Sequence, residues 1–133
     1  MFRPVRKGDW TSQIDPLLER MAERSGGRYS ADHLYDGLAR GLTWVAEIDN
    51  WRAAMIVKPI NWPTGLNELE IVGLAGDGLP EWQDAMFSAE RIARDLHFNR
   101  ITIPHGRKGW VKPCEAHGWK QTGVILEKDF FDG

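Results

Sequence analysis

The sequence predicts an α/β protein with elements in the order ααβββαβαβ, and the changing period of its apolar residues supports that order. The spacing is helical near the start, alternates as in strands over residues 42–72, and is helical again from residue 80. A short strand, a short helix and a last strand follow. The 133 residues fit one domain, residues 1–133, which can bury a hydrophobic core without disulfides or metals.

Two helices are expected first. The first has one buried stripe at the i, i+3, i+4, i+7 spacing, formed by Ile14, Leu17, Leu18 and Met21. Thr11 or Ser12 can cap its start, and the stretch "SGGR" ends it. Ser30 then caps a second, shorter helix, which Gly41 closes.

Three strands are expected next. The stretches "LTWVAEI" and "RAAMIVKPI" read as strands joined by a hairpin turn at Asp49-Asn50. After the loop "NWPTGLN", the stretch "ELEIV" reads as a third strand. Its alternation puts Glu68, Glu70 and Val72 on one face and Leu69 and Ile71 on the other.

The second half of the chain begins with the longest expected helix, Pro80–Phe98. Its apolar face consists of Trp82, Ala85, Met86, Ala89, Ala93 and Leu96. The stretch "RITIP" follows as a strand, and "KGWVKPCEAHG" follows as a short helix that Gly118 stops. The stretch "KQTGVILEKDF" is then the last strand.

Composition excludes several classes of protein. The net charge of −2 argues against a generic nucleic-acid binder. No apolar run approaches the ~20 residues that a membrane helix needs. No apolar signal core follows the basic start "MFRPVRKGDW", and a single cysteine suits a reducing compartment, so a cytoplasmic location is expected.

The element order and the closing unit "CEAHGWKQTGVILEKDF" resemble the GNAT superfamily of N-acyltransferases, and the spacing is similar to that of small GNAT-like proteins of phages and prophages. In that family two helices precede an antiparallel meander, here Leu42–Val72, and a pyrophosphate loop, here Gly73–Gly78, leads into the main helix. The resemblance implies a mixed, mostly antiparallel sheet flanked by helices. It also implies acetyl-CoA as cofactor and acetyl transfer to an amine of a small molecule or a protein.

The stretch "IVGLAGDGLPEW" carries the cofactor part of the resemblance. It keeps the glycines of the family pattern Arg/Gln-x-x-Gly-x-Gly/Ala as Gly73-x-x-Gly76-x-Gly78, but Gly73 replaces the basic or amide residue. Backbone N–H groups of such a loop, with a helix dipole behind them, bind a pyrophosphate. The cofactor-binding residues that the resemblance implies are Ile71, Val72, Gly73, Gly76, Asp77, Gly78 and Arg107.

Asp77 weakens this interpretation. Two unit charges ~4 Å apart repel by roughly 4 kcal/mol at an effective dielectric constant near 20. A helix N-terminus returns only about 0.3–1 kcal/mol per charge. The alternative is that Asp77 bonds the amides of its own turn or caps the following helix.

Acyl transfer of the implied kind needs a base for the amine and an acid for the leaving thiolate. The family's base is often a carboxylate on the central strand, so Glu70, or Glu68 on the same face, is the candidate. The alternative is that alternating Glu marks a solvent-facing side. Cys114 stands where the family usually has its acidic tyrosine, although it is shorter and can equally be a small buried hydrophobe. Tyr35 is the substitute phenol.

Basic and aromatic residues gather late in the chain, namely Arg100, His105, Arg107, Lys108, Trp110, Lys112, His117, Trp119 and Lys120. In the GNAT interpretation "HGRKGW" reaches a nucleotide phosphate. The same residues suit stacking on a single-stranded nucleic acid, or form a solvated face with the tryptophans in the core. The histidines have no ligand-like spacing, so no metal site is expected.

Two functions therefore stay open. One is an acyl-CoA-dependent N-acyltransferase, which the glycine spacing and element order favour. The other is a GNAT-like scaffold without cofactor that contacts a protein or a nucleic acid, as an accessory factor of a phage in a host cytoplasm. The weakened loop and the missing tyrosine favour this second function.

Overall fold

The computed structural model describes residues 2–3, 14–48, 52–76, 79–104, 106 and 108–131. Its elements in chain order are β1 (Phe2–Arg3), α1 (Ile14–Glu23), α2 (Ala31–Ala39), β2 (Trp44–Ile48), β3 (Ala53–Asn61), β4 (Asn67–Gly76), α3 (Leu79–Asp95), β5 (Arg100–Thr102), a 3-10 turn (Lys108–Trp110) and α4 (Val111–Ala116). The predicted caps Thr11 and Ser12 and the turn Asp49-Asn50 lie outside the described residues.

The sheet is mixed and mostly antiparallel, as predicted. Its strands follow in the order β1-β2-β3-β4-β5. The pairs β1–β2, β2–β3 and β3–β4 are antiparallel, and β4–β5 is parallel. The two-residue strand β1 is too short to give a periodic signal and was not expected.

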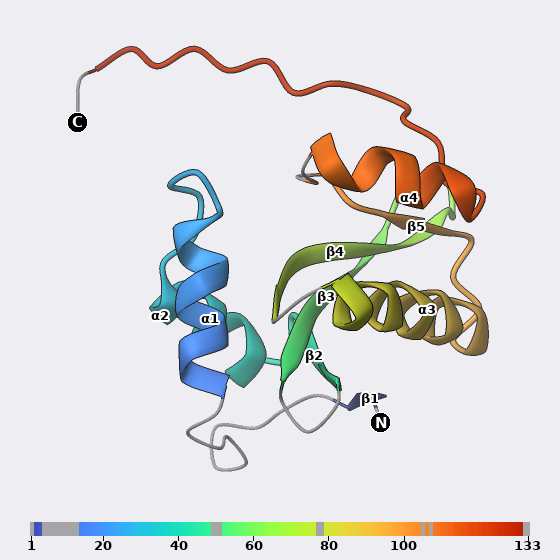
Figure 1. The fold of residues 1–133 in the computed structure, drawn as a ribbon, viewed down its shortest axis with the longest axis horizontal. Coiled ribbons are helices and arrows are strands. Elements are labelled where there is room, and N and C mark those ends of the chain that lie inside the picture. Colours follow the sequence, from blue (N-terminus) through green and yellow to red (C-terminus); the bar gives the residue numbers. More distant parts are fainter. Residues whose placement is uncertain are drawn as a thin grey trace.

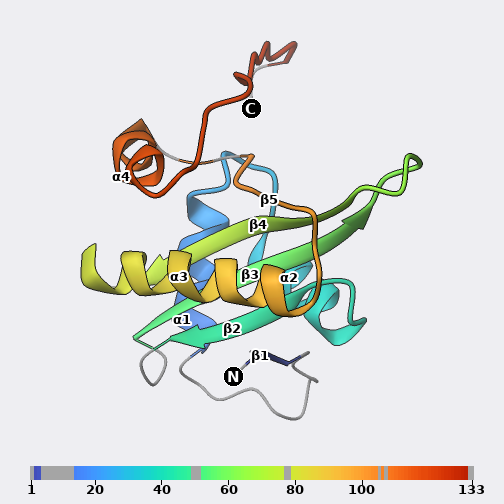
Figure 2. The same ribbon diagram turned by 90° about the vertical axis from the view of Figure 1, so that its right-hand side faces the viewer.

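Helices cover both faces of the sheet, with α1 and α2 on one face and α3 on the other (Figures 1 and 2). The predicted stripe of α1 is buried throughout and packs with residues of α2 and of β2–β4. On α3, the predicted positions Ala85, Met86, Ala89 and Ala93 are buried against the other face. The prediction is wrong at Leu96, which is exposed because α3 ends at Asp95.

The short helices begin and end where the sequence predicts. The Ser30 side chain accepts from the His33 backbone N–H at the start of α2, and the His33 side chain accepts from the Ser30 N–H in return. Gly41 and Gly118 follow α2 and α4 with φ of 72° and 88°, a conformation that glycine adopts without strain.

The last strand is the main error of the predicted order. Residues 119–130 form no regular secondary structure and run out from α4 as an extended chain (Figure 1). The stretch has strand-forming residues, but no other strand lies beside it among the described residues. A strand needs a hydrogen-bonding neighbour, so composition alone does not form one.

Candidate active site

An opening between β4 and β5 lies at one end of the sheet, because β5 is the last strand of the order. β3 pairs with β4 from Asn67 to Gly76, whereas β5 pairs with β4 over three positions, of which Glu70 opposite Thr102 is the last. Beyond that pair, β4 continues to Gly76 while β5 has ended. The two parallel strands therefore stop pairing after Glu70, and the edge of β4 beyond it is not paired by β5.

A β-bulge marks the same point. On β3, Ile56 pairs with Gly73 and the next residue, Val57, pairs with Ile71, so Val72 is an extra residue on β4. Bulges increase local twist and redirect the strand. The bulge thus helps to turn the second half of β4 away from β5.

The predicted loop Gly73–Gly78 is wrong at its start, because Gly73 and Gly76 belong to β4. A Cβ on Gly73 would lie 3.0 Å from the sulfur of Met21 on α1. A Cβ on Gly76 would lie 2.4 Å from the Ala53 Cβ and 2.9 Å from its Cα. Glycine at these two positions permits close packing against α1 and β3. This packing is sufficient to explain why both residues are glycine.

Helix α3 begins almost directly after β4. Only residues 77 and 78 stand between Gly76 and Leu79, the first residue of this 17-residue helix. A helix N-terminus carries unpaired backbone N–H groups that favour an anion. Asp77, Gly78 and Arg107, which the resemblance implied for cofactor binding, lie outside the described residues.

Glu68 is buried and engaged. It is 8% exposed, its Oε2 accepts from the Thr102 hydroxyl at 3.3 Å, and its Oε1 lies 3.8 Å from the Arg100 guanidinium. The alternative hypothesis of a solvent-facing strand is therefore wrong at this residue. Because Leu69 and Ile71 pack towards α3, Glu68 and Glu70 point to the α1–α2 face, as the alternation predicts.

Glu70 differs from Glu68 in its partners. It is half-buried, and within the described part of the chain its carboxylate makes no hydrogen bond or ion pair. It is also the last β4 residue paired with β5. Glu70 thus places at the opening a carboxylate that has no partner among the described residues.

Cys114 lies on the opposite face, in a hollow between α3 and α4. The hollow has a volume of about 10 Å³, room for one water, and is lined by Gln83, Met86, Phe87, Glu90, Cys114, His117 and Trp119. Burial, and secondarily the Glu90 carboxylate, raise the pKa of the Cys114 thiol above its ordinary value. The thiol is therefore protonated at neutral pH and is a poor nucleophile.

Two contacts close this hollow. The Trp119 indole N–H donates to Glu90 Oε1 at 2.8 Å, and the rings of Phe87 and His117 meet edge to face with centroids 5.2 Å apart. A core position for the tryptophans was one of the interpretations that the sequence left open, whereas Glu90 was not among the predicted site residues. Glu90 lies four residues after Met86 and three before Ala93, so the sequence already places its carboxylate on the buried stripe of α3.

The predicted catalytic residues do not form one cluster. Tyr35, on α2, packs with the apolar cluster of the α1–α2 face, whereas Cys114 belongs to the cluster under α3. Glu70 points to the same face as Tyr35. This geometry does not fix their roles, so the three assignments stay predictions.

Comparison with known proteins agrees with this architecture. No protein-family model and no curated protein matches the chain. Among solved structures, it is similar to a predicted acetyltransferase from Clostridium acetobutylicum with acetyl-CoA (TM-score 0.65, 17% identity, 97% of this chain and 95% of that one). It is also similar to a ribosomal-protein-alanine N-acetyltransferase from Brucella melitensis biovar Abortus 2308 (TM-score 0.68, 16% identity, 98% and 99%).

A third similar structure is the glucosamine-6-phosphate N-acetyltransferase of Arabidopsis thaliana (TM-score 0.66, 11% identity, 98% of both chains). The fold is that of the GNAT acetyltransferases. At these identities the likeness shows the GNAT fold alone, and the chemistry has to be argued from the residues. None of the described helices is both long and apolar enough to cross a membrane.

Proposed function

We propose that the protein is an acyl-CoA-dependent N-acyltransferase that moves an acetyl group from acetyl-CoA to an amine. The observation that carries the proposal is the opening between β4 and β5, which begins after Glu70 and Thr102 and leads towards the start of α3. In a GNAT fold this is where a cofactor has both a strand edge and a helix N-terminus within reach.

The residues present fit such a cofactor in two respects. From Ile71 to Gly76, β4 has a backbone edge that β5 does not pair, and the pantetheine arm carries amides that can add to a strand edge. The N-terminus of α3 can receive the pyrophosphate. Bound acetyl-CoA would supply the acyl group as an activated thioester. The set implied by the resemblance, from Ile71 to Gly78 with Arg107, remains our proposal for the binding residues.

Glu70 is the proposed base. The attacking amine has to lose a proton, either directly or through a water, as its nitrogen bonds to the acyl carbon and the C–S bond breaks. The Glu70 carboxylate stands at the opening without a competing partner among the described residues, whereas Glu68 is held by Arg100 and Thr102. We therefore prefer Glu70 to Glu68.

Cys114 and Tyr35 are the two candidates for the acid that protonates the leaving thiolate. The protonated Cys114 thiol has a proton to donate, but its side chain lies in the closed hollow under α3. Tyr35 offers a phenol on the other face. A thiolate leaving group also takes a proton readily from water, so the reaction does not require either residue.

A second candidate function is a GNAT-fold binding protein without cofactor. The specific observation in its favour is the small hollow between α3 and α4 that holds Cys114, the residue in place of the family's tyrosine, where Trp119 is hydrogen-bonded to Glu90 and a single water fits. Asp77 adds a negative charge next to α3 in the sequence. Such a scaffold would contact a protein or, less in keeping with the net charge of −2, a nucleic acid, as an accessory factor of a phage in its host's cytoplasm.

Calorimetric titration of the purified chain with CoA and acetyl-CoA separates the two functions. The enzyme proposal expects micromolar binding, and Asp77→Ala should tighten it because a repulsive charge is removed. Asp36→Ala is the matched control, since Asp36 lies on α2 in an exposed ion pair with Arg40. Absence of binding at millimolar cofactor would overturn the enzyme proposal and favour the scaffold.

The acceptor is proposed only as an amine of a small molecule or a protein. The similar structures include enzymes named for an amino sugar phosphate and for the alanine of a ribosomal protein. A screen with glucosamine 6-phosphate and with alanine-starting peptides, followed by free-thiol release, is the direct test of these two acceptor classes.

A further inference from the structure

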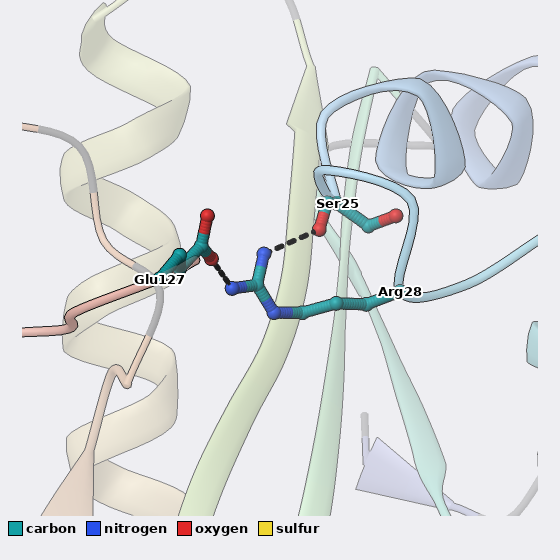
Figure 3. Close-up of polar contacts among 3 residues, drawn as sticks. All are labelled: Ser25, Arg28 and Glu127. Carbon is teal, nitrogen blue, oxygen red and sulfur yellow. Dashed lines mark hydrogen bonds and ion pairs between the residues drawn. The ribbon is translucent and has the colours of Figure 1, made fainter. Parts of the chain in front are cut away.

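The connection between α1 and α2 presents an arginine in a fixed orientation. In the stretch "SGGR", Arg28 folds back so that its Nη1 donates to the Ser25 carbonyl at 2.9 Å (Figure 3). Gly26 and Gly27 turn the chain here with φ of 67° and 84°, a conformation that glycine adopts without strain. A Cβ on Gly26 would lie 2.8 Å from the Arg28 Nη1, so an added side chain would displace the guanidinium. The glycine thus leaves the space that the guanidinium occupies.

Ser25, which receives this hydrogen bond, is itself held in place. Its hydroxyl donates to the Ala22 carbonyl at 2.7 Å and accepts from the Tyr29 backbone N–H at 3.0 Å. Tyr29 packs against the apolar cluster of the α1–α2 face, and so does Val72 of β4, two residues beyond Glu70. The connection therefore lies on the face of the sheet to which Glu70 points.

A carboxylate of the same chain is bound to this guanidinium. The Arg28 Nη2 donates to Oε1 of Glu127, in the extended segment that follows α4 (Figure 3). Within the described part of the chain, no other hydrogen bond or ion pair joins this C-terminal segment, residues 120–131, to the rest of the molecule. The side chains of Arg28 and Glu127 are 32% and 59% exposed, and ion pairs in such positions contribute little. Another anion can therefore displace Glu127.

A guanidinium held in this way is suited to binding a carboxylate or a phosphate. Its planar set of N–H groups matches the oxygens of both anions, and its charge strengthens the hydrogen bonds. The contact with Ser25 uses Nη1, whereas Nη2 is the nitrogen that meets the carboxylate of Glu127. Because Glu70, the proposed base, lies on the same face, an amine at Glu70 and an anion at Arg28 can belong to one acceptor molecule.

We propose that Arg28 binds an anionic group of the acceptor, and that Glu127 occupies Arg28 until the acceptor displaces it. This inference rests on the proposed acetyl transfer with Glu70 as base. It narrows the acceptor to an amine that also carries a carboxylate or a phosphate. The C-terminal segment is then an internal competitor of the acceptor. Its effective concentration at Arg28 is high because it belongs to the same chain, but a single exposed ion pair holds it there.

Matched pairs of acceptors test the preference for an anion. Free-thiol release from acetyl-CoA is compared for glucosamine 6-phosphate against glucosamine, and for peptides that begin with alanine-glutamate against alanine-glutamine. In at least one pair, kcat/KM of the wild type should be about tenfold or more higher for the anionic member, because a hydrogen bond to a charged group is lost in the neutral one. Arg28→Gln should remove this preference, mainly through KM. The pair that responds identifies the anion as phosphate or carboxylate.

Two further variants separate the roles of the ion pair. Glu127→Gln removes the internal competitor and should lower KM for the anionic acceptor about two- to sixfold, the range that an exposed ion pair allows. Arg40→Gln is the matched control for Arg28→Gln, because Arg40 also forms an exposed ion pair, with Asp36 of α2. It should keep the preference. A preference that is absent from the wild type, or that persists in Arg28→Gln, would overturn the proposal, and an unchanged KM in Glu127→Gln would overturn the competition.

A binding measurement distinguishes this inference from the proposed function. In an NMR titration of the full chain, with and without CoA, the anionic acceptor of the responding pair should shift the Arg28 Nε–H signal and its neutral counterpart should not. If no pair responds, glucosamine 6-phosphate and the alanine-glutamate peptide are both titrated. A shift at Arg28 without any binding of CoA would support the anion site and contradict acetyl transfer. Acetyl transfer without a shift at Arg28 would contradict the anion site and leave the proposed function standing. Neither shift nor CoA binding would contradict both.

Discussion

The two halves of β4 belong to one strand but have different surroundings. Asn67–Glu70 is hydrogen-bonded on both edges, and its Glu68 is buried with Arg100 and Thr102 as partners. Ile71–Gly76 contains the bulge at Val72 and, among the described residues, pairs with β3 alone. The first half is therefore fixed by the sheet, whereas the second half keeps one backbone edge available. The binding site that we propose therefore depends on the early end of β5 beside β4.

The largest expected effect comes from the residue at which the two halves meet. Glu70→Gln keeps the size of the side chain but cannot accept a proton. If Glu70 is the base, kcat/KM for acetyl transfer should fall about 100-fold or more, the usual contribution of a general base. Binding of CoA, measured by calorimetry, should hardly change, because Glu70 is not among the proposed cofactor-binding residues.

Glu47→Gln is the matched control for this substitution. Glu47 lies on β2, points to the same face as Glu70 by strand alternation, and is separated from β4 by β3. Its loss should leave the rate unchanged. Equal rates for Glu70→Gln and the wild type would show that the base is another group, and the difference between the halves of β4 would then concern binding alone.

A second prediction concerns the glycines of the second half. Gly76→Ala should lower the free energy of unfolding by about 3 kcal/mol, near the upper end for overpacking, because the new Cβ meets the Ala53 backbone 2.9 Å away. Gly73→Ala should cost only about 1 kcal/mol, since the Met21 side chain that it meets can move. Denaturant unfolding followed by circular dichroism measures both.

The two glycine variants also test the cofactor interpretation. If Gly76 is needed for packing against β3, Gly76→Ala should lose more free energy of unfolding than free energy of CoA binding, both measured on protein that still folds. The reverse result, normal stability with lost binding, would return Gly76 to the phosphate site that the family pattern implies.

These glycines show where sequence reasoning stops. The stripe of α1, the caps of α2 and the buried face of α3 follow from local spacing, and the structure has them. Gly73 and Gly76 looked like a loop because glycine is poor in strands. Met21 and Ala53, which explain them, are distant in sequence. The boundary of β4 therefore depended on tertiary contacts that no local pattern contains.

The candidate site was predictable to a similar extent. Alternation alone places Glu68 and Glu70 on one face, but the burial of Glu68 depends on Arg100 and Thr102 of a parallel neighbour. The Trp119–Glu90 hydrogen bond joins α3 to the segment that follows α4, which is far away in the sequence. The stretch "KQTGVILEKDF" has strand composition, yet a strand also needs a neighbouring strand to pair with, and none lies beside it among the described residues.

The smallest expected effect concerns Cys114, which shares a core cluster with Leu69 and Ile71 at the junction of the two halves. Because the folded protein raises the pKa of this thiol above its ordinary 9.0, the unfolded chain loses the proton first as the pH rises. The stabilisation of the fold by the buried, protonated thiol is thus complete below about pH 9, and it is lost as the pH approaches the folded pKa. The free energy of unfolding then falls by at most about 1.4 kcal/mol per pH unit. The stability difference between wild type and Cys114→Ala should therefore narrow from pH 8 to pH 10 in denaturant unfolding. A constant difference would mean that the thiol ionises equally in both states, as expected of a group open to the cofactor rather than packed in the core.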